Sequence, residues 1–371
     1  MKHQIILLGR DLTSVYHGIK ELKPDYIHLI ETDETKDIYK PLLNLLPKNI
    51  LCKVYHTDPY DCKNIIRICK DIHREFEGVF SYNLSEGTKP MAFAACRVAI
   101  EYHAYPFYLT QLGDSVRMDT YEITPLNCIL NNKEILALSG NNISQYQDAK
   151  ELKDEDIRAS RKIKNFIENY PDVYTRLRKF FGIYCKSELA CLPSSQTLGD
   201  DIRFKQKDGT IHVMQQNRTL LRLNQPNATF LLFDGRWWET LVAQQVRNWS
   251  RLQPKSPEVW QSVIFQSPGE NQMKNEVDVL LNNKQKVIFI ECKSGMVGSN
   301  DIYKIDAVRQ TYGGNISQAV LASYYPIEKN LKEKCHDLQI ELFAPPTKSD
   351  RKDFIQNLPN WLDTISEEVL L

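Results

Sequence analysis

The first 125 residues alternate short apolar runs with segments of helical periodicity, and this alternation strongly constrains the fold. Such β-α alternation predicts a parallel sheet with helices on both faces. Ligands of such sheets bind at the carboxyl ends of strands, near a switch in strand order. The expected strands are 4–8, 26–30, 51–55, 79–82 and 105–110, and the expected helices are 14–22, 36–46, 61–76 and 90–103.

Two loops that follow expected strands carry residues suited to an anionic ligand. One is Gly-Arg-Asp-Leu-Thr-Ser at 9–14, and the other is Asn-Leu-Ser-Glu-Gly-Thr-Lys-Pro-Met at 83–91. In the second loop Gly87 lets the backbone approach a ligand, and Thr88 can cap the following helix. Lys89 adds a positive charge at a helix N-terminus, which already favours anions. The loop therefore indicates phosphate binding, with an ordinary capped turn as the alternative; it is not a Walker A loop.

A pair of strand-like runs, 275–281 and 287–293, carries a second group of polar residues. Asp278 lies in the first run, and Glu291 and Lys293 end the second, after a continuously apolar Val-Ile-Phe-Ile. Residues two apart share one face of a strand, and charges at the end of a buried strand need partners or a metal. Carboxylate oxygens suit Mg²⁺ or Mn²⁺, and such a cation polarises a scissile phosphate. The runs thus indicate metal-dependent phosphodiester cleavage, with an ion-paired sheet edge as the alternative.

Flanking segments complete an order of helix, strand, strand, helix and strand. The first helix opens at 235–243 and carries Glu239, the second covers 301–312, and the last strand covers 316–322. We therefore expect Glu239 near Asp278 and Glu291. Glu276 is a weaker ligand candidate, since we expect it on the opposite side of its strand.

This arrangement resembles the PD-(D/E)xK nuclease superfamily, which has the restriction-endonuclease-like fold. Asp278, Glu291 and Lys293 match its Asp…Glu-x-Lys core, and Glu239 matches the helix acid of many members. The Pro of the family name is absent, because Val277 precedes Asp278. The resemblance implies that Lys293 positions the attacking hydroxide. The implied ligands of Mn²⁺ or Mg²⁺ are Asp278, Glu291 and the Cys292 backbone carbonyl, with Glu239 assisting.

The second amino-terminal loop resembles the motif of the CARF (CRISPR-associated Rossmann fold) domain, Asn-x-Thr/Ser-Gly-Gly-Thr-Lys-x-Met. Glu86 departs from it, since a glycine is usual there. CARF domains sense cyclic oligoadenylates made by type III CRISPR complexes, as dimers with the ring across the two-fold axis. The implied ring contacts are Arg10, Asp11, Thr13 and Ser14 from the first loop and Asn83, Ser85, Gly87, Thr88, Lys89 and Met91 from the second.

One CARF domain followed by one PD-(D/E)xK domain resembles the effector nucleases that cyclic tetra-adenylate activates. The resemblance implies an α/β homodimer of antiviral defence that cleaves or nicks DNA, with RNA open as a second substrate. We expect a Rossmann-like sensor at 1–130, a connector of helices and then short strands at 131–224, and a restriction-endonuclease-like domain at 225–371.

Three alternatives to this function stay open. The chain could be a restriction or repair nuclease that needs no activator. It could also be a non-catalytic nucleotide-sensing regulator that binds DNA through its middle region. As a third alternative, the CARF domain could degrade its own activator.

Composition excludes some classes of protein. The formal net charge is zero over 371 residues, so nucleic acid can be bound only through a local patch. For the basic cluster Arg158, Arg161, Lys162 and Lys164 we favour a solvated helix face over such a contact. Nine cysteines and eight histidines show no paired ligand spacing, so we predict no zinc site. The odd cysteine count and the lack of a leader-like or membrane-spanning apolar run predict a cytoplasmic protein.

Overall fold

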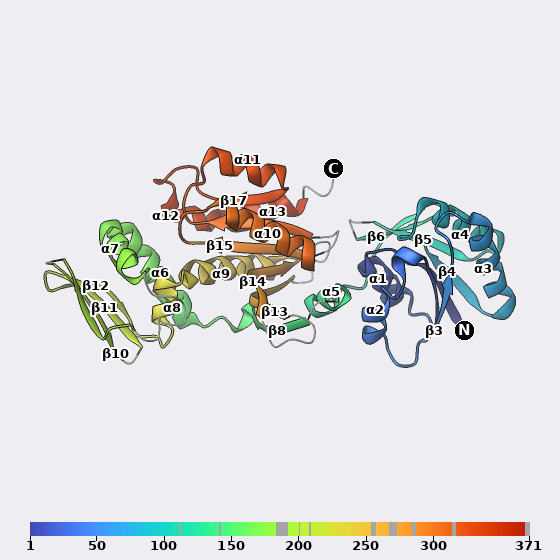
Figure 1. Cartoon of the computed structure of the whole chain (residues 1–371), viewed down its shortest axis with the longest axis horizontal. Coiled ribbons are helices and arrows are strands. Elements are labelled where there is room, and N and C mark those ends of the chain that lie inside the picture. The colour runs from blue at the N-terminus through green and yellow to red at the C-terminus, as the bar shows by residue number, and fades with distance from the viewer. Residues whose placement is uncertain are drawn as a thin grey trace.

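The computed structural model of the chain describes residues 1–110, 113–140, 142–182, 192–199, 201–207, 209–253, 257–266, 273–283, 287–313 and 317–367. Three sheets follow one another along the longest axis of the molecule (Figure 1). The amino-terminal sheet lies at one end, a six-stranded sheet in the middle, and a four-stranded sheet at the other end. Within these residues no helix is both long and apolar enough to cross a membrane.

The amino-terminal sheet confirms the predicted parallel architecture. Its order is β3-β2-β1-β4-β5-β6-β7, and the pairs among the first five strands are all parallel. The order reverses between β1 and β4, so the chain continues from these two neighbouring strands toward opposite edges of the sheet. The elements are β1 (Lys2–Leu7), α1 (Leu12–Leu22), β2 (Tyr26–Glu31), η1 (Asp33–Thr35), α2 (Lys40–Leu45), β3 (Leu51–His56), α3 (Cys62–Glu75), β4 (Val79–Asn83), α4 (Lys89–Glu101), β5 (Tyr105–Leu109), β6 (Asp114–Arg117) and β7 (Ile123–Pro125).

One expected helix of this domain is shorter than the sequence suggests. The segment 36–46 is helical only over α2, after the short turn η1. Asp37 separates the two, because its φ of 62° lies in the left-handed region and cannot continue a right-handed helix.

A short helix joins the amino-terminal domain to the six-stranded sheet. This helix, α5 (Asn132–Leu138), packs on α1 and α2 and is followed by β8 (Asn142–Asp148) and η2 (Ala149–Glu151). A single apolar core continues from α1 through α5 to β13 and β14 of the six-stranded sheet. Although β8 falls in the expected connector, it pairs with β13 as an edge strand of that sheet.

The six-stranded sheet has the order β17-β16-β15-β14-β13-β8 and holds the predicted acids. The expected order of elements missed one strand, β13, between the first helix and Asp278. Helix α9 packs against β13, β14 and β15, and α10 packs on β15 and β16. The elements are α9 (Arg236–Leu252), β13 (Glu258–Gln266), β14 (Met273–Asn282), β15 (Val287–Lys293), α10 (Ser299–Tyr312), β16 (Ser317–Ser323), α11 (Lys329–Asp337), β17 (Ile340–Phe343), α12 (Arg351–Phe354), η5 (Ile355–Asn357) and α13 (Leu358–Glu367).

The middle region forms an antiparallel four-stranded sheet, β12-β11-β10-β9, beside three helices. Its apolar core runs on into that of α9 and the six-stranded sheet. Of the expected basic cluster, Lys164 is buried and pairs with Glu168 at 2.8 Å, whereas the other three side chains are exposed. The elements are α6 (Asp154–Asn169), α7 (Pro171–Phe181), β9 (Ser195–Leu198), β10 (Ile202–Lys207), β11 (Thr210–Gln215), β12 (Arg218–Leu223) and α8 (Ala228–Phe233).

Candidate functional site

Two neighbouring strands bring the predicted catalytic acids together. Val279 on β14 pairs with Ile290 on β15, and this is the last ladder pair before Asp278 and Glu291. Beyond the ladder, the backbone amide of Cys292 donates a 2.7 Å hydrogen bond to Oδ2 of Asp278. The side chain of Asp278 therefore replaces the missing ladder bond and is held against β15.

Helix α9 places Glu239 beside these strands. Glu239 lies in the first turn of α9, whose cap, Gly235, has a φ of 88°. A Cβ atom at Gly235 would lie 2.5 Å from Oγ of Ser294, the residue after Lys293. The indole nitrogen of the buried Trp238 donates to the backbone oxygen of Ala322 at 2.9 Å, which anchors α9 on the sheet. Gly235 thus allows the start of the helix to approach the end of β15.

A network of ion pairs surrounds Glu291 and Lys293. The Nζ atom of Lys293 lies 3.0 Å from Oε1 of Glu291 and 2.9 Å from Oδ1 of Asp301. Lys304, on α10, contacts the same Oε1 of Glu291 at 3.2 Å. Asp301 is itself fixed, because its Oδ2 accepts the backbone amide of Gly298 at 2.8 Å. Lys293 is therefore held between two carboxylates.

Together, burial and neighbouring charges raise the pKa values of both Asp278 and Lys293 in this cluster. Burial, and then the neighbouring charges of Glu239 and Glu291, raise the pKa of Asp278 well above its usual range. Burial alone would lower the pKa of Lys293, but Glu291 and Asp301 outweigh it and raise that pKa. The site thus keeps a positive lysine beside a group of mutually repelling acids.

The donor atoms of these residues suit a divalent cation, although their present arrangement does not form a ligand set. Within the described ranges, no three acidic, histidine or cysteine side chains are grouped so that they could hold a metal ion as they stand. Glu291 is instead engaged by Lys293 and Lys304. The chemistry of the donor set nevertheless fits, because the carboxylates of Asp278, Glu239 and Glu291 are hard oxygen ligands whose repulsion a cation would relieve.

The same pocket, of about 400 Å³, contains residues that the sequence analysis missed or misplaced. Glu276 lines it together with Asp278, so its expected position on the opposite side of β14 is wrong; residues two apart share a face. Asp301 and Lys304 come from α10, and Arg178 comes from α7 of the middle region. The only sequence signal for any of them is the cap at Gly298 and Asp301 that starts α10.

The two predicted anion-binding loops lie at the switch in strand order of the amino-terminal sheet. They follow β1 and β4, which pair in parallel. The Asn83 side-chain amide donates to the backbone oxygen of Ser14 at 3.2 Å, and the Ser14 hydroxyl donates to Oε1 of Glu86 at 3.3 Å. The structure thus joins the loops at the position where ligands of such folds bind.

Both loops end in a capped helix, as predicted for Thr88; the cap at Asp11 was not predicted. Asp11 accepts the backbone amide of Thr13 at 2.8 Å, and Thr88 accepts that of Met91 at 3.4 Å. Gly87 has a φ of 79°, which a residue with a side chain rarely adopts. The other predicted ring contacts divide by exposure: Arg10 and Lys89 are exposed, Ser85 is half-buried and bonded to Asn83, and Met91 is fully buried beneath the loop.

Glu86, which departs from the motif, lies within this loop pair. Its carboxylate packs against Gly9, where any Cβ atom would collide with it. Burial, and then the charge of Asp11, raise the pKa of Glu86 to about 7. This carboxyl group therefore changes its charge near neutral pH, inside the predicted anion site.

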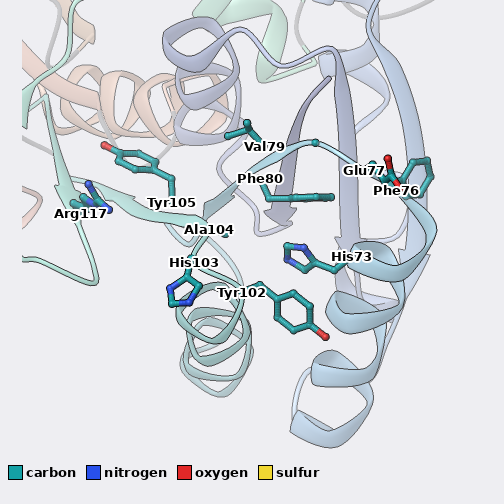
Figure 2. A pocket seen from close by; sticks show the side chains of 11 residues that line it. His73, Phe76, Glu77, Val79, Phe80, Tyr102, His103, Ala104, Tyr105 and Arg117 are labelled. Carbon is teal, nitrogen blue, oxygen red and sulfur yellow. The ribbon is translucent and has the colours of Figure 1, made fainter.

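A separate pocket of about 500 Å³ lies at the opposite end of the amino-terminal sheet, where β4 and β5 begin (Figure 2). Aromatic rings dominate it: His73 packs on Phe80 at 4.1 Å and on Tyr102 at 4.3 Å between ring centroids. Arg117, at its edge, is paired with Asp119 at 2.7 Å. None of the predicted anion-binding residues lines this pocket.

Comparisons with known proteins find a family model for the carboxyl-terminal part of the chain and solved structures of the same fold. Residues 227–362 match the family model described as "Card1-like, endonuclease domain". The fold is similar to Can2 from Sulfobacillus thermosulfidooxidans, solved with cyclic tetra-adenylate: the TM-score is 0.72 and the identity 20%, over 98% of this chain and 99% of that one. Protein VC1899 from Vibrio cholerae gives a TM-score of 0.70 at 19% identity over 98% of both chains.

A third structure with this fold is a type III CRISPR defence DNA nuclease activated by cyclic oligoadenylate. It matches with a TM-score of 0.60 and 12% identity, over 97% of this chain and 51% of the other. No curated protein matches the chain. The predicted resemblance is confirmed: the chain has the fold of these structures along nearly its whole length, and its residues 227–362 match the Card1-like endonuclease domain.

Proposed function

We propose that the chain is a metal-dependent nuclease of the PD-(D/E)xK type, activated by cyclic tetra-adenylate in type III CRISPR defence. Its substrate is DNA, cut as single strands or nicked in supercoiled duplex, with single-stranded RNA as a second substrate to be tested. The observation that carries the proposal is that Asp278, Glu239, Glu291 and Lys293 line one pocket of a domain that matches an endonuclease family.

The chain's own residues supply orientation and charge for the reaction. Because Glu291 and Asp301 raise the pKa of Lys293, its side chain stays an ammonium group at neutral pH. It therefore serves as a fixed donor that orients the attacking water and offsets negative charge on the phosphate in the transition state. Asp301 is the second carboxylate, besides Glu291, that holds the ammonium group in place.

A divalent cation, Mn²⁺ or Mg²⁺, would be held by Asp278, Glu291 and the Cys292 backbone carbonyl, with Glu239 assisting. When bound, it would supply Lewis-acid polarisation of the scissile phosphate. Lys293 and Lys304 both contact Oε1 of Glu291, so a cation would compete with them for that oxygen.

The activator would bind at the two loops that follow β1 and β4. Their position at the switch in strand order, the helix N-termini of α1 and α4, and the exposed Lys89 all suit phosphate groups. Can2, which has this fold, was solved with cyclic tetra-adenylate. The proposed contacts are Arg10, Asp11, Thr13, Ser14, Asn83, Ser85, Gly87, Thr88 and Lys89, with Met91 supporting the second loop from below.

Activation would proceed in a homodimer with one ring between two amino-terminal domains. The ring has to bind the active arrangement more tightly than the inactive one, because only a difference in affinity shifts such an equilibrium. Helix α5 is suited to transmit this change, since its core contacts reach both α1 and the six-stranded sheet.

The proposal is tested by cleavage of single-stranded DNA, supercoiled plasmid and RNA in Mn²⁺, with and without cyclic tetra-adenylate. We expect cleavage only with the activator, and none by the Lys293→Ala variant. Cleavage without the activator would retain the nuclease and reject the sensor. Tight binding of the ring without cleavage under any condition would favour a regulator.

A further inference from the structure

The middle region carries an exposed sheet face on which positive charge is concentrated. The sequence from Ile202 to Leu223 contains five Lys or Arg residues and one acid, so its formal charge is +4 in a chain whose net charge is zero. Residues alternate along these strands: the inward side chains of Phe204, Val213 and Leu221 are buried. Arg203, Lys205, Lys207 and Arg222 are exposed.

The strand register places basic side chains directly beside one another. Lys205 on β10 is opposite His212 on β11, and His212 is opposite Arg222 on β12. Between the described residues, no ion pair engages Arg203, Lys205, Lys207 or Arg222. The exposed cations of this face therefore lack acidic partners within the described part of the chain, and a polyanion would supply them.

The other side of this unit reaches the candidate active site. The sheet packs its apolar face on α6, α7 and α8, with Phe181 of α7 against Phe204 at 4.6 Å between ring centroids. Three residues before Phe181, Arg178 lines the pocket that holds Asp278 and Glu291. The middle region thus contacts the pocket with one helix and displays cations on its far face.

We propose that the exposed face of β10, β11 and β12 binds the phosphate backbone of the nucleic-acid substrate outside the cutting site. The central residues are Arg203, Lys205 and Arg222, with His212 between the last two. Contacts to phosphate groups carry no information about the bases. We therefore expect binding that depends on charge and salt concentration rather than on the nucleotide sequence. This inference rests on the proposed nuclease function for the identity of the polyanion.

The test compares two variants that each lose three positive charges. One is Arg203→Gln/Lys205→Gln/Arg222→Gln, which leaves Lys207 in place. The control is Lys329→Gln/Lys332→Gln/Lys348→Gln, exposed positions of the carboxyl-terminal region that do not line the pocket. Binding of fluorescein-labelled single-stranded and duplex DNA is measured in EDTA over a range of salt concentrations, so that cleavage is not required.

We expect the sheet variant to bind DNA about tenfold or more weakly at low salt, with a slope of log affinity against log salt smaller by about 2 to 3. The control should bind like the wild type. With Mn²⁺ and activator, KM of the sheet variant should rise while kcat and the affinity for cyclic tetra-adenylate stay unchanged. The Arg203→Lys/Arg222→Lys variant should bind like the wild type, because it keeps the charges.

Folding of the sheet variant is checked by its melting temperature, which should stay close to that of the wild type, since the three exchanged side chains are exposed. Unchanged DNA binding by the sheet variant, or equal weakening in the control, would overturn the proposal. The same variants are also tested for binding to anionic phospholipid vesicles. If the sheet variant loses binding to the vesicles but still binds DNA, the proposal is overturned as well. If the sheet variant binds DNA more weakly and the wild type cleaves no substrate, the nuclease function is rejected and this surface is still supported.

Discussion

The Cys292 backbone amide and the Asp278 carboxylate are joined by a 2.7 Å hydrogen bond just beyond the last ladder pair of β14 and β15. The bond ties Asp278 to the strand that carries Glu291 and Lys293. The relative positions of these three residues are therefore set by two paired strands rather than by a loop. Such support is what precise positioning of reacting groups requires.

Replacing Asp301 should weaken catalysis through Lys293. In Asp301→Asn the 2.9 Å ion pair to Lys293 loses its charge, so the lysine is positioned by Glu291 alone and its pKa falls. We expect kcat to drop by about tenfold to a hundredfold and the loss of activity at alkaline pH to begin at a lower pH. The matched control is Asp306→Asn on the same helix, where the acid pairs with Arg309. Equal pH–rate profiles for the two variants would contradict the positioning role.

Lys89 should set the amount of activator that is needed. It is exposed at the start of α4, beside Gly87 and the cap Thr88. Removal of this charge in Lys89→Ala should raise the activator concentration for half-maximal cleavage by about tenfold, with the maximal rate unchanged. Lys63→Ala, an exposed position on α3, serves as the control. A lower maximal rate at saturating activator would speak against a role confined to binding.

Binding of the activator should depend on pH through Glu86. Burial and Asp11 raise the pKa of this carboxyl group to about 7, so it is mostly neutral below that pH and charged above it. Since the activator is an anion, its affinity should fall several-fold as the pH rises through about 7, by roughly 1 kcal/mol of repulsion. Glu86→Gln cannot ionise and should bind equally well across this range. Calorimetric titrations of both proteins above and below pH 7 test the point, and parallel pH dependences would refute it.

Gly235→Ala should destabilise the start of α9. An alanine there has to adopt a φ of 88° and would place its Cβ atom 2.5 Å from Oγ of Ser294. We expect the free energy of unfolding to fall by about 1 to 3 kcal/mol in denaturant titrations. Gly298→Ala should change it by less than about 0.5 kcal/mol, because the φ of −116° at that cap suits any residue. Similar losses in both variants would show that the backbone conformation at Gly235 is not the cause.

Much of the fold could be predicted because local patterns agree with the final structure. Strands β1 to β5 are short apolar runs bounded by turns, and their alternation with helices is enough to indicate a parallel sheet. Strand β13 escaped prediction for a local reason. The alternation of apolar and polar residues is broken at Ser262, whose backbone φ is 48°. The pairing of β13 with β14 is interrupted at the same residue, between the pairs Gln261–Val279 and Val263–Val277.

The candidate site was predicted only in part, because some of its residues come together only when helices dock in the folded protein. Asp278, Glu291 and Lys293 lie on paired strands, so spacing alone indicates that they meet. Lys304 and Arg178 reach the pocket only through the docking of α10 and α7, which the sequence pattern of a helix does not specify. The position of Arg178 in the sequence does not indicate that it reaches the pocket, since more than a hundred residues separate it from Glu291.

The central claim is that one pocket cuts nucleic acid and a different site receives the activator. It is tested most directly with Glu291→Gln, a variant of similar size that lacks the charge of the proposed metal ligand. Cleavage of single-stranded DNA in Mn²⁺ and binding of cyclic tetra-adenylate by calorimetry are measured on the same preparation. We predict that cleavage is abolished and that the ring binds as tightly as to the wild type. Cleavage at the wild-type rate would contradict the assignment of the active site.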